Sequence, residues 1–364
     1  MASRATAKAR PDPFKTPFAA GVVGSLPRPP VVRETLPADP GAESVKQARS
    51  PRMDAFVRYA VALQEEAGLD VVSDGEWRRH SYTNIIGDIA DGFSHDPREG
   101  RWGIAVTEKL AVRRPGLFAE EARFLVAATS RATKVCMPSP YLLGVRLWEK
   151  SMSTKAYPTR DAFIEEVVPI LHKELVGLRD TGVSVVQIDD PHLCVLVDPK
   201  VRKTFADPKY ELDLAVAKIN EVIAGVKGLR LALHLCRRNW GRRGWGAEGG
   251  YEPVLDAMKR INVQQYVLEF SIPVAGDMAV LKGLPDDAYI GLGCLDCRFP
   301  KVEAPEEIAA RVERAMQYVD AERLSLNPDC GFAPGRQSEV PLDEAYQKLK
   351  SEAAASAMLR DKHG

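Results

Sequence analysis

Eight short apolar runs, separated by longer segments, constrain the fold more than any other feature of this sequence. The runs are rich in β-branched residues and are bounded by Gly, Pro or Asp, whereas most of the intervening segments have helical periodicity. They span residues 20–24, 70–73, 134–137, 183–188, 229–235, 265–268, 289–293 and 323–326. Strands that alternate with helices are typical of a parallel sheet, and eight such units predict an α/β fold, the (β/α)8 TIM barrel.

The segments between the strands complete this prediction. Helices are expected at residues 53–67, 160–179, 212–226, 251–259, 305–319 and 342–359. The span 77–133 is too long for one helix and contains an alternating run at 102–110, which predicts an inserted hairpin after strand two. Residues 1–17 lack apolar periodicity and are expected to form a flexible arm, so 18–364 is predicted to be a single catalytic domain.

The composition excludes several classes of partner. Lys plus Arg and Asp plus Glu are both 50, so no net charge attracts nucleic acid or an anionic membrane. No stretch approaches the ~18 consecutive apolar residues of a membrane span, and the basic N-terminus lacks the apolar centre of a signal peptide. We therefore expect a cytoplasmic protein that acts on small molecules; the sequence does not indicate an oligomeric state.

Polar residues gather where the predicted strands end, which is where barrels of this type build their active sites. In strand order they are Ser25; Asp74 and Glu76; Asp189 and Asp190; His234 and Cys236; Glu269; Asp296; and Asn327, Asp329 and Cys330. His234 and Cys236 are two residues apart on a strand, so both side chains face the same side. With Cys330 and Glu269 they supply the four nitrogen, sulfur and oxygen ligands that suit Zn2+.

Some of these residues also permit a structural interpretation. Glu269 can instead pair with an arginine of the cluster Arg237, Arg238, Arg242 and Arg243. The spacing of Cys294 and Cys297 fits a metal or redox pair, but a structural role is favoured because the two side chains need not converge. Cys136 and Cys194 are interpreted as buried apolar residues. Whether Trp77, Trp240 and Trp245 line a pocket or only pack is left open.

The motifs at the strand ends resemble the catalytic barrel of cobalamin-independent methionine synthases, over about residues 21–331. They are Val23-Gly24-Ser25-Leu26-Pro27, Ser73-Asp74-Gly75-Glu76, Gln187-Ile188-Asp189-Asp190-Pro191, His234-Leu235-Cys236, Leu268-Glu269, the segment 291–296 and Asn327-Pro328-Asp329-Cys330-Gly331. The stretch 247–253 is similar to the single-barrel branch, which lacks the duplicated N-terminal half. The resemblance implies that His234, Cys236, Glu269 and Cys330 bind zinc.

The resemblance also implies a substrate and a reaction. Ser25, Glu76 and Asp189 match residues that hold the amino-acid part of homocysteine, and two carboxylates facing an ammonium group are electrostatically favourable. The expected enzyme is a zinc-dependent S-methyltransferase that activates L-homocysteine as a zinc thiolate and methylates it to methionine.

The sequence departs from the family in ways that concern the methyl donor. One barrel replaces the two that hold polyglutamyl methylfolate, which indicates another donor, such as a methylated corrinoid protein or a small methylated compound. After strand seven the family has an Asp-x-His step, here Asp296 and Arg298, and an arginine cannot act as the acid near neutral pH. Asp296 and Arg298 are the candidate catalytic residues, and Arg298 would suit a phosphate, sulfonate or carboxylate.

Three other functions remain as alternatives. Alkyl transfer to another thiol such as coenzyme M would use Arg298 and its neighbouring arginines for the sulfonate, although Glu76 and Asp189 favour an amine-bearing thiol. A decarboxylase barrel of the uroporphyrinogen type would leave the four zinc ligands without a purpose. A purely structural zinc protein would not need the acidic residues around them.

Overall fold

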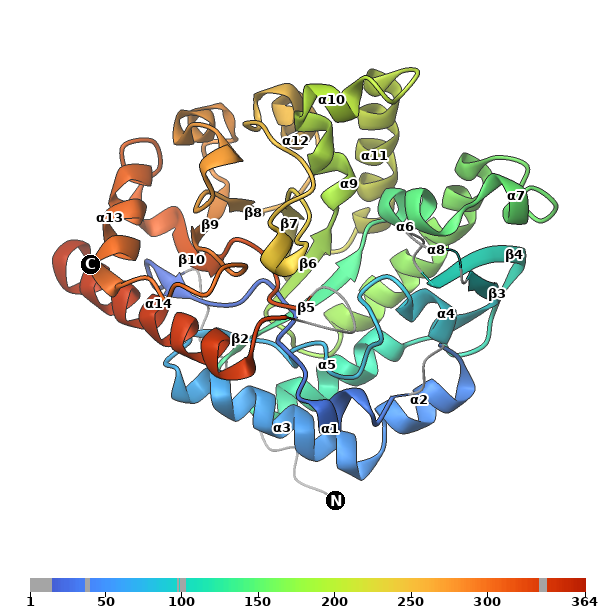
Figure 1. The fold of residues 1–364 in the computed structure, drawn as a ribbon, viewed down its shortest axis with the longest axis horizontal. Coiled ribbons are helices and arrows are strands. Elements are labelled where there is room, and N and C mark those ends of the chain that lie inside the picture. Colours follow the sequence, from blue (N-terminus) through green and yellow to red (C-terminus); the bar gives the residue numbers. More distant parts are fainter. Residues whose placement is uncertain (1–14, 37–39, 97, 99–102, 334–338) are drawn as a thin grey trace.

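Eight parallel strands form one nearly closed barrel in the computed structural model, which describes residues 15–36, 40–96, 98, 103–333 and 339–364 (Figure 1). The strands are β1 (Ala19–Ala20), β2 (Val71–Val72), β5 (Ala132–Pro138), β6 (Val185–Asp189), β7 (Arg230–Leu235), β8 (Gln265–Glu269), β9 (Tyr289–Leu295) and β10 (Leu324–Pro328). Their order in the sheet is β1-β10-β9-β8-β7-β6-β5-β2, and a parallel bridge between Gly21 and Val71 joins the two ends. The predicted (β/α)8 barrel is confirmed.

Helices surround the strands (Figure 1). They are α1 (Pro30–Arg33), α2 (Ala42–Ala48), α3 (Pro51–Glu66), α4 (Ile85–Ile89), α5 (Leu117–Ala128), α6 (Pro140–Leu147), α7 (Lys150–Ser153), α8 (Arg160–Arg179), α9 (Pro191–Cys194), α10 (Pro199–Arg202), α11 (Pro208–Ile223), α12 (Leu255–Lys259), α13 (Pro305–Ala315) and α14 (Leu342–His363). The side chains of Ser50, Thr159 and Asp207 accept hydrogen bonds from the first turns of α3, α8 and α11, which explains where these helices begin. Among the described residues, no helix is both long and apolar enough to cross a membrane.

The insertion after β2 is a hairpin, as predicted. Strands β3 (Ala90–Asp96) and β4 (Gly103–Val112) pair antiparallel. The hairpin lies beside α6 and α7, and the Tyr157 hydroxyl accepts a hydrogen bond of 2.8 Å from the backbone N–H of Leu110. Residues 1–14 of the predicted arm lie outside the described residues, and the division of the chain at residue 18 stays a prediction.

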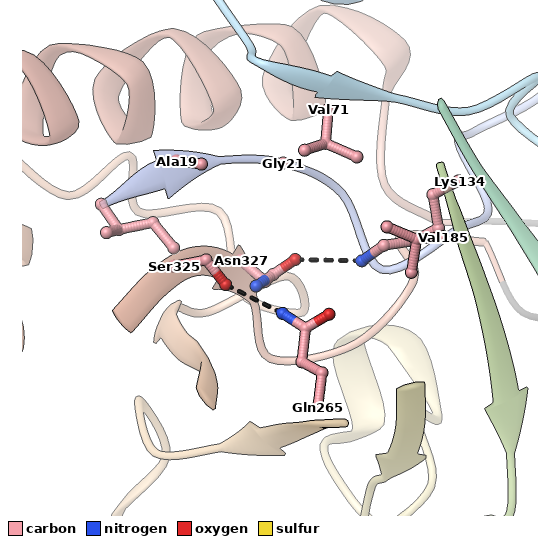
Figure 2. A pocket seen from close by; sticks show the side chains of 9 residues that line it. Ala19, Gly21, Val71, Lys134, Val185, Gln265, Ser325 and Asn327 are labelled. Carbon is pink, nitrogen blue, oxygen red and sulfur yellow. Dashed lines mark hydrogen bonds between the residues drawn. The ribbon is translucent and has the colours of Figure 1, made fainter. Parts of the chain in front are cut away.

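The interior of the barrel is polar as well as apolar. Val23, Val185, Ala232 and Val267 form a small buried cluster that is separate from the large core between strands and helices. Below it, near the amino ends of the strands, Lys134 donates to Asn327 Oδ1 at 3.2 Å and Gln265 donates to Ser325 Oγ at 3.1 Å across a small cavity (Figure 2). Because side chains two apart on a strand share a face, alternate residues of each strand point into the barrel from its amino end to its carboxyl end.

Candidate metal and substrate site

Three of the four predicted metal ligands meet at the carboxyl end of the barrel. His234 lies on β7, Cys236 follows it, and Cys330 follows β10. All three side chains are buried, and one ligand atom from each lies within 4.8 Å of the others. A tetrahedral zinc site with bonds of about 2.0 to 2.3 Å places its ligand atoms about 3.5 to 3.8 Å apart. The three donors therefore fit one such ion.

The His234 ring is oriented for metal binding. Its Nδ1 lies 3.0 Å from the carbonyl oxygen of Val267, an acceptor that assigns the proton to Nδ1. Its Nε2 is buried and has no hydrogen-bond partner among the residues that the structure describes. Although burial lowers it, the pKa of the ring is raised to about 9 by Cys236 and by the carboxylates of Asp189 and Glu269, so Nε2 carries a proton in the metal-free protein and would lose it to a metal ion.

The two thiols near this ring differ in acidity. A hydrogen bond from Cys330 holds the pKa of the Cys236 thiol well below its usual range, against the effect of burial, and His234 adds to this shift. The same hydrogen bond and burial raise the pKa of Cys330. One thiolate is therefore stabilised at this position, and thiolate is the form in which cysteine binds metals.

Glu269, the fourth predicted ligand, faces arginines. Its side chain is fully buried, and its Oε1 forms a hydrogen-bonded ion pair with Nη2 of Arg298. Its Oε2 accepts a hydrogen bond of 2.6 Å from the backbone N–H of Arg237 and lies 3.5 Å from that residue's Nη1. The structure therefore shows the arginine pairing that the sequence left open, and it adds Arg298 to that pairing.

Arg298 is a buried counter-ion to several carboxylates. Its side chain is 0% exposed, and its Nη1 lies 3.6 Å from Asp296 and 3.7 Å from Asp329. Asp329 in turn accepts hydrogen bonds of 3.0 Å from the backbone N–H groups of Phe270 and Ser271. These contacts make Arg298 part of the framework behind the site, which differs from the predicted clamp on a substrate anion.

A second group of donors lies at the same mouth of the barrel. Ligand-type atoms of Glu76, Cys136 and Asp189 lie within 4.8 Å of one another. Burial raises the pKa of Glu76 to about 7 although Arg79 opposes the shift, and burial raises the pKa of Asp189 to about 6 although His234 opposes it. Burial makes the ionised form of both carboxylates unfavourable. A cation bound between them would favour that form, so the pair is suited to a cationic group.

The backbone around Glu76 is shaped for this contact. Glu76 has φ 57°, in the left-handed region that non-glycine residues seldom adopt. A Cβ on Gly24 would lie 2.5 Å from Oε1 of Glu76 and 2.8 Å from Sγ of Cys136, so this position requires glycine. Ser25 lies next to it, and its hydroxyl accepts a hydrogen bond of 3.3 Å from the backbone N–H of Ala333.

The structure shows where the three tryptophans left open by the sequence lie. Trp77 is fully buried and donates to the Leu26 carbonyl at 3.3 Å, so it packs. Trp240 is 44% exposed, and the Trp245 ring meets Phe299 edge-on at 6.4 Å.

The cysteines outside the triad of His234, Cys236 and Cys330 differ in their surroundings. Cys294 and Cys297 are both buried, and the Cys294 thiol donates to the carbonyl oxygen of Asn327 at 3.5 Å. Cys136, expected to be an ordinary core residue, instead points into the barrel beside Glu76 and Asp189, and its two-residue spacing from the inward-facing Lys134 could have indicated this.

Sequence reasoning also missed a basic group at the mouth of the barrel. It comprises Arg146, His192 and Arg238, which come from three different segments. The three residues lie far apart in the sequence and belong to no motif, so the group can be recognised only in the folded structure.

Comparisons with known proteins agree with this geometry. Residues 18–355 match the family model described as the catalytic domain of cobalamin-independent synthase. A methionine synthase of Pyrococcus horikoshii is 29% identical over 347 residues, which cover 93% of this chain and 92% of that protein. The methionine synthase of Pyrococcus abyssi is 30% identical over 356 residues, with 93% and 92% covered.

A solved structure shares the fold. It is a B12-independent methionine synthase from a Shewanella species in complex with selenomethionine, and it has a TM-score of 0.76 at 23% identity, with 95% of this chain and 99% of that chain covered. Together with the matches in sequence, this supports an enzyme of the methyltransferase class. The chain therefore belongs to the cobalamin-independent methionine synthase family, in its single-barrel branch.

Proposed function

We propose that this protein is a zinc-dependent methyltransferase that transfers a methyl group to the thiol of L-homocysteine and forms methionine. The observation that carries the proposal is the triad of His234, Cys236 and Cys330, whose buried imidazole Nε2 and stabilised thiolate adjoin an acidic pair. The names of the methionine synthase relatives support the same reaction.

The residues present fit a zinc ion. His234 Nε2 and the sulfurs of Cys236 and Cys330 would hold it, and Glu269, the last residue of β8, lies at the same mouth as the fourth candidate ligand. When bound there, zinc would lower the pKa of the substrate thiol, so that the nucleophilic thiolate exists at neutral pH.

The acidic pair is proposed to bind the amino group of the substrate. Glu76 and Asp189 are both buried and lie within reach of one cation. Gln187 donates to Asp189 Oδ1 at 2.8 Å and so fixes the orientation of that carboxylate. An ammonium group between the two carboxylates would offset the cost of burying their charges, which favours an amine-bearing thiol over one that carries only a sulfonate.

The methyl donor is proposed to be a compound other than polyglutamyl methylfolate, because the matches to methionine synthases, which span this one barrel, cover 92% of those proteins. The comparisons support neither a corrinoid-protein donor nor the coenzyme M alternative, and neither is proposed here. Asp296 and Arg298 are proposed to act by positioning, since Arg298 contacts Glu269, Asp296 and Asp329 and is fully buried.

Calorimetric titration of the zinc-loaded protein with L-homocysteine tests this function. We expect stoichiometric binding with release of about one proton, because the thiol ionises on binding. The variant Cys330→Ser should lose the response, whereas Cys194→Ser, which changes a buried cysteine outside the triad, should keep it. Binding of another thiol in place of homocysteine would reject methionine formation, and an equal response in Cys330→Ser would reject the metal site.

A further inference from the structure

Two arginines converge on one histidine at the mouth of the barrel. Arg146 lies in the last turn of α6, and its Nε is 3.1 Å from Nε2 of His192. Arg238 follows β7, and its Nη2 is 2.9 Å from Nδ1 of the same ring. The Arg146 guanidinium also lies over the ring of Tyr82, 5.0 Å from its centroid.

Both nitrogens of the His192 ring face guanidinium N–H groups. An arginine can only donate, and a neutral imidazole has one N–H and one accepting nitrogen. Burial, together with Arg146 and Arg238, lowers the pKa of His192 well below its usual range, so the ring is neutral. Only one of the two contacts with the ring can therefore be a hydrogen bond, and the other brings two N–H groups face to face.

Arg238 has no carboxylate partner among the described residues. Its Nε is buried and has no hydrogen-bond partner among the described residues. The salt bridges of its loop involve Arg237 and Arg242, and within the described part of the chain none involves Arg238. Asp190 interacts electrostatically with Arg146. Its carboxylate oxygens already accept hydrogen bonds from the Ser139 hydroxyl at 2.5 Å and from the backbone N–H of Leu193 at 2.8 Å.

The backbone at Arg238 is held in an unfavourable conformation. Its φ of 64° lies in the left-handed region, which glycine adopts more easily than arginine does. Such strain persists where the surrounding structure imposes it, and it is commonly found at ligand sites. The sequence thus places a long cation at a position where the backbone alone would favour glycine.

The basic group adjoins the substrate site. Arg238 is two residues beyond the proposed ligand Cys236, and His192 is three residues beyond Asp189, with which the substrate amino group is proposed to pair. We propose that Arg146 and Arg238, on either side of His192, form an anion subsite that binds a carboxylate or phosphate group of a substrate. Guanidinium groups donate to the planar or tetrahedral arrangement of oxygens in such anions, and an anion here would give the buried Nε of Arg238 an acceptor.

The anion could belong to either substrate of the proposed reaction. It could be the carboxylate of homocysteine, or it could be a carboxylate or phosphate on the methyl donor. The inference rests on the proposed methyl transfer only in assigning the anion to one of its two substrates. The convergence of Arg146 and Arg238 on His192 does not depend on that reaction.

Binding of inorganic phosphate to the zinc-loaded protein tests the subsite. We expect Arg238→Gln to weaken phosphate binding at least tenfold in calorimetry, and Arg146→Gln to do the same. Arg243→Gln, which changes an exposed arginine on the same loop, should stay within twofold of the wild type. Arg238→Gly removes the cation and relieves the backbone, so it should lose phosphate binding without a fall in Tm. Equal phosphate binding in the wild type and Arg238→Gly, or none in the wild type, would overturn the proposal.

A second titration identifies the source of the anion. L-homocysteine is compared with 3-aminopropanethiol, which has the same amine and thiol but no carboxylate. If the subsite holds the homocysteine carboxylate, Arg238→Gly weakens binding of homocysteine alone; if it holds the donor, neither thiol is affected while phosphate binding is lost. Absence of homocysteine binding in the wild type would contradict the proposed function and leave the phosphate result interpretable.

Discussion

Arg298 limits which ligand atoms of this site are available to a metal ion. Glu269 carries the expected ligand oxygens, yet both of them contact arginine nitrogens. A carboxylate paired with a guanidinium is less available to a cation, whereas a lone buried carboxylate is strongly destabilising. Arg298 is therefore expected to stabilise the metal-free protein and to compete with zinc for Glu269.

Replacement of Arg298 should lower the stability of the metal-free protein and raise its affinity for zinc. In Arg298→Met the metal-free protein should lose about 3 kcal/mol of unfolding free energy, because Glu269 becomes a buried charge with one partner fewer. Zinc should bind about tenfold more tightly in chelator competition, and the visible spectrum of the cobalt-substituted protein should shift as an oxygen ligand is added.

Arg160→Met is the control for this experiment, because its carboxylate partner is Glu211 on α11. It should leave the zinc affinity and the cobalt spectrum unchanged. If Arg298→Met binds zinc no more tightly than the wild type and has the same cobalt spectrum, Glu269 does not become a ligand and the proposed competition is wrong.

Glu76 predicts the pH dependence of substrate binding. Burial raises its pKa to about 7, and only the ionised form attracts an ammonium group. Release of the thiol proton raises the affinity about tenfold per pH unit at every pH below the thiol pKa. The amine of the substrate stays charged over this range, so the need to ionise Glu76 should steepen this slope to about a hundredfold per unit below about pH 7. Calorimetry across this range measures the slope.

Glu76→Gln separates this effect from the other titrating groups. The variant should bind homocysteine weakly at every pH, and the pH at which the slope steepens should move down toward about 6, the raised pKa of Asp189. A wild-type slope that stays the same between about pH 6 and pH 8 would show that Glu76 does not bind the amine.

At the scale of elements, the strands were predictable because of their environment. Buried parallel strands are continuous apolar runs, and all eight were identified, as were most of the outer helices. Helix α6 was missed because it has only eight residues, most of them apolar and buried, and so short an apolar run cannot be assigned to a helix from its periodicity. The inward-facing row at the strand ends likewise predicted His234, Cys236 and Cys330.

The partners of those side chains were not predictable. The acceptor for His234 is a backbone carbonyl, a group that every residue carries. Glu269 and Arg298 are 29 residues apart, and Arg146 and His192 are 46 apart, so their contacts depend on how loops cross the mouth of the barrel. Sequence pattern identified the functional residues, but it could not specify their hydrogen bonds.

Helix α14 holds the loop that carries Asp296 and Arg298. Lys348 Nζ donates to the carbonyl oxygens of Asp296, Phe299 and Lys301 at 2.8, 2.7 and 2.6 Å. Because Lys348→Met leaves these carbonyls without their donor, we expect a loss of about 3 kcal/mol in denaturant unfolding.

An exposed lysine on the same helix provides the control. Lys350→Met should cost less than about 0.5 kcal/mol, because its side chain lies in solvent. Lys348→Met should also increase amide hydrogen exchange in residues 296–301, while Lys350→Met should not. Equal unfolding free energies for the two variants would show that the lysine does not hold this loop.

At the scale of the whole molecule, the metal triad connects distant parts of the barrel. His234 and Cys236 belong to the β7 segment and Cys330 to the β10 segment, and β8 and β9 lie between these strands in the sheet. The barrel is closed elsewhere by a single bridge between Gly21 and Val71. An ion that binds residues of β7 and β10 together would therefore stabilise the folded state of the entire barrel, because the unfolded chain does not hold them together.

Removal of zinc should consequently lower the melting temperature of the whole domain. Zinc at about a thousandfold excess over its Kd adds about 4 kcal/mol to folding, so chelation should lower Tm by on the order of 10 °C in scanning calorimetry. Cys330→Ser and His234→Ala should reduce this difference to a few degrees, because each removes one ligand. Cys297→Ser, a buried cysteine outside the triad, should keep the full difference even if its own Tm is lower. A wild-type Tm that is the same with zinc and with chelator would mean that these three side chains do not bind the ion, since any ligand that binds only the folded chain must raise Tm.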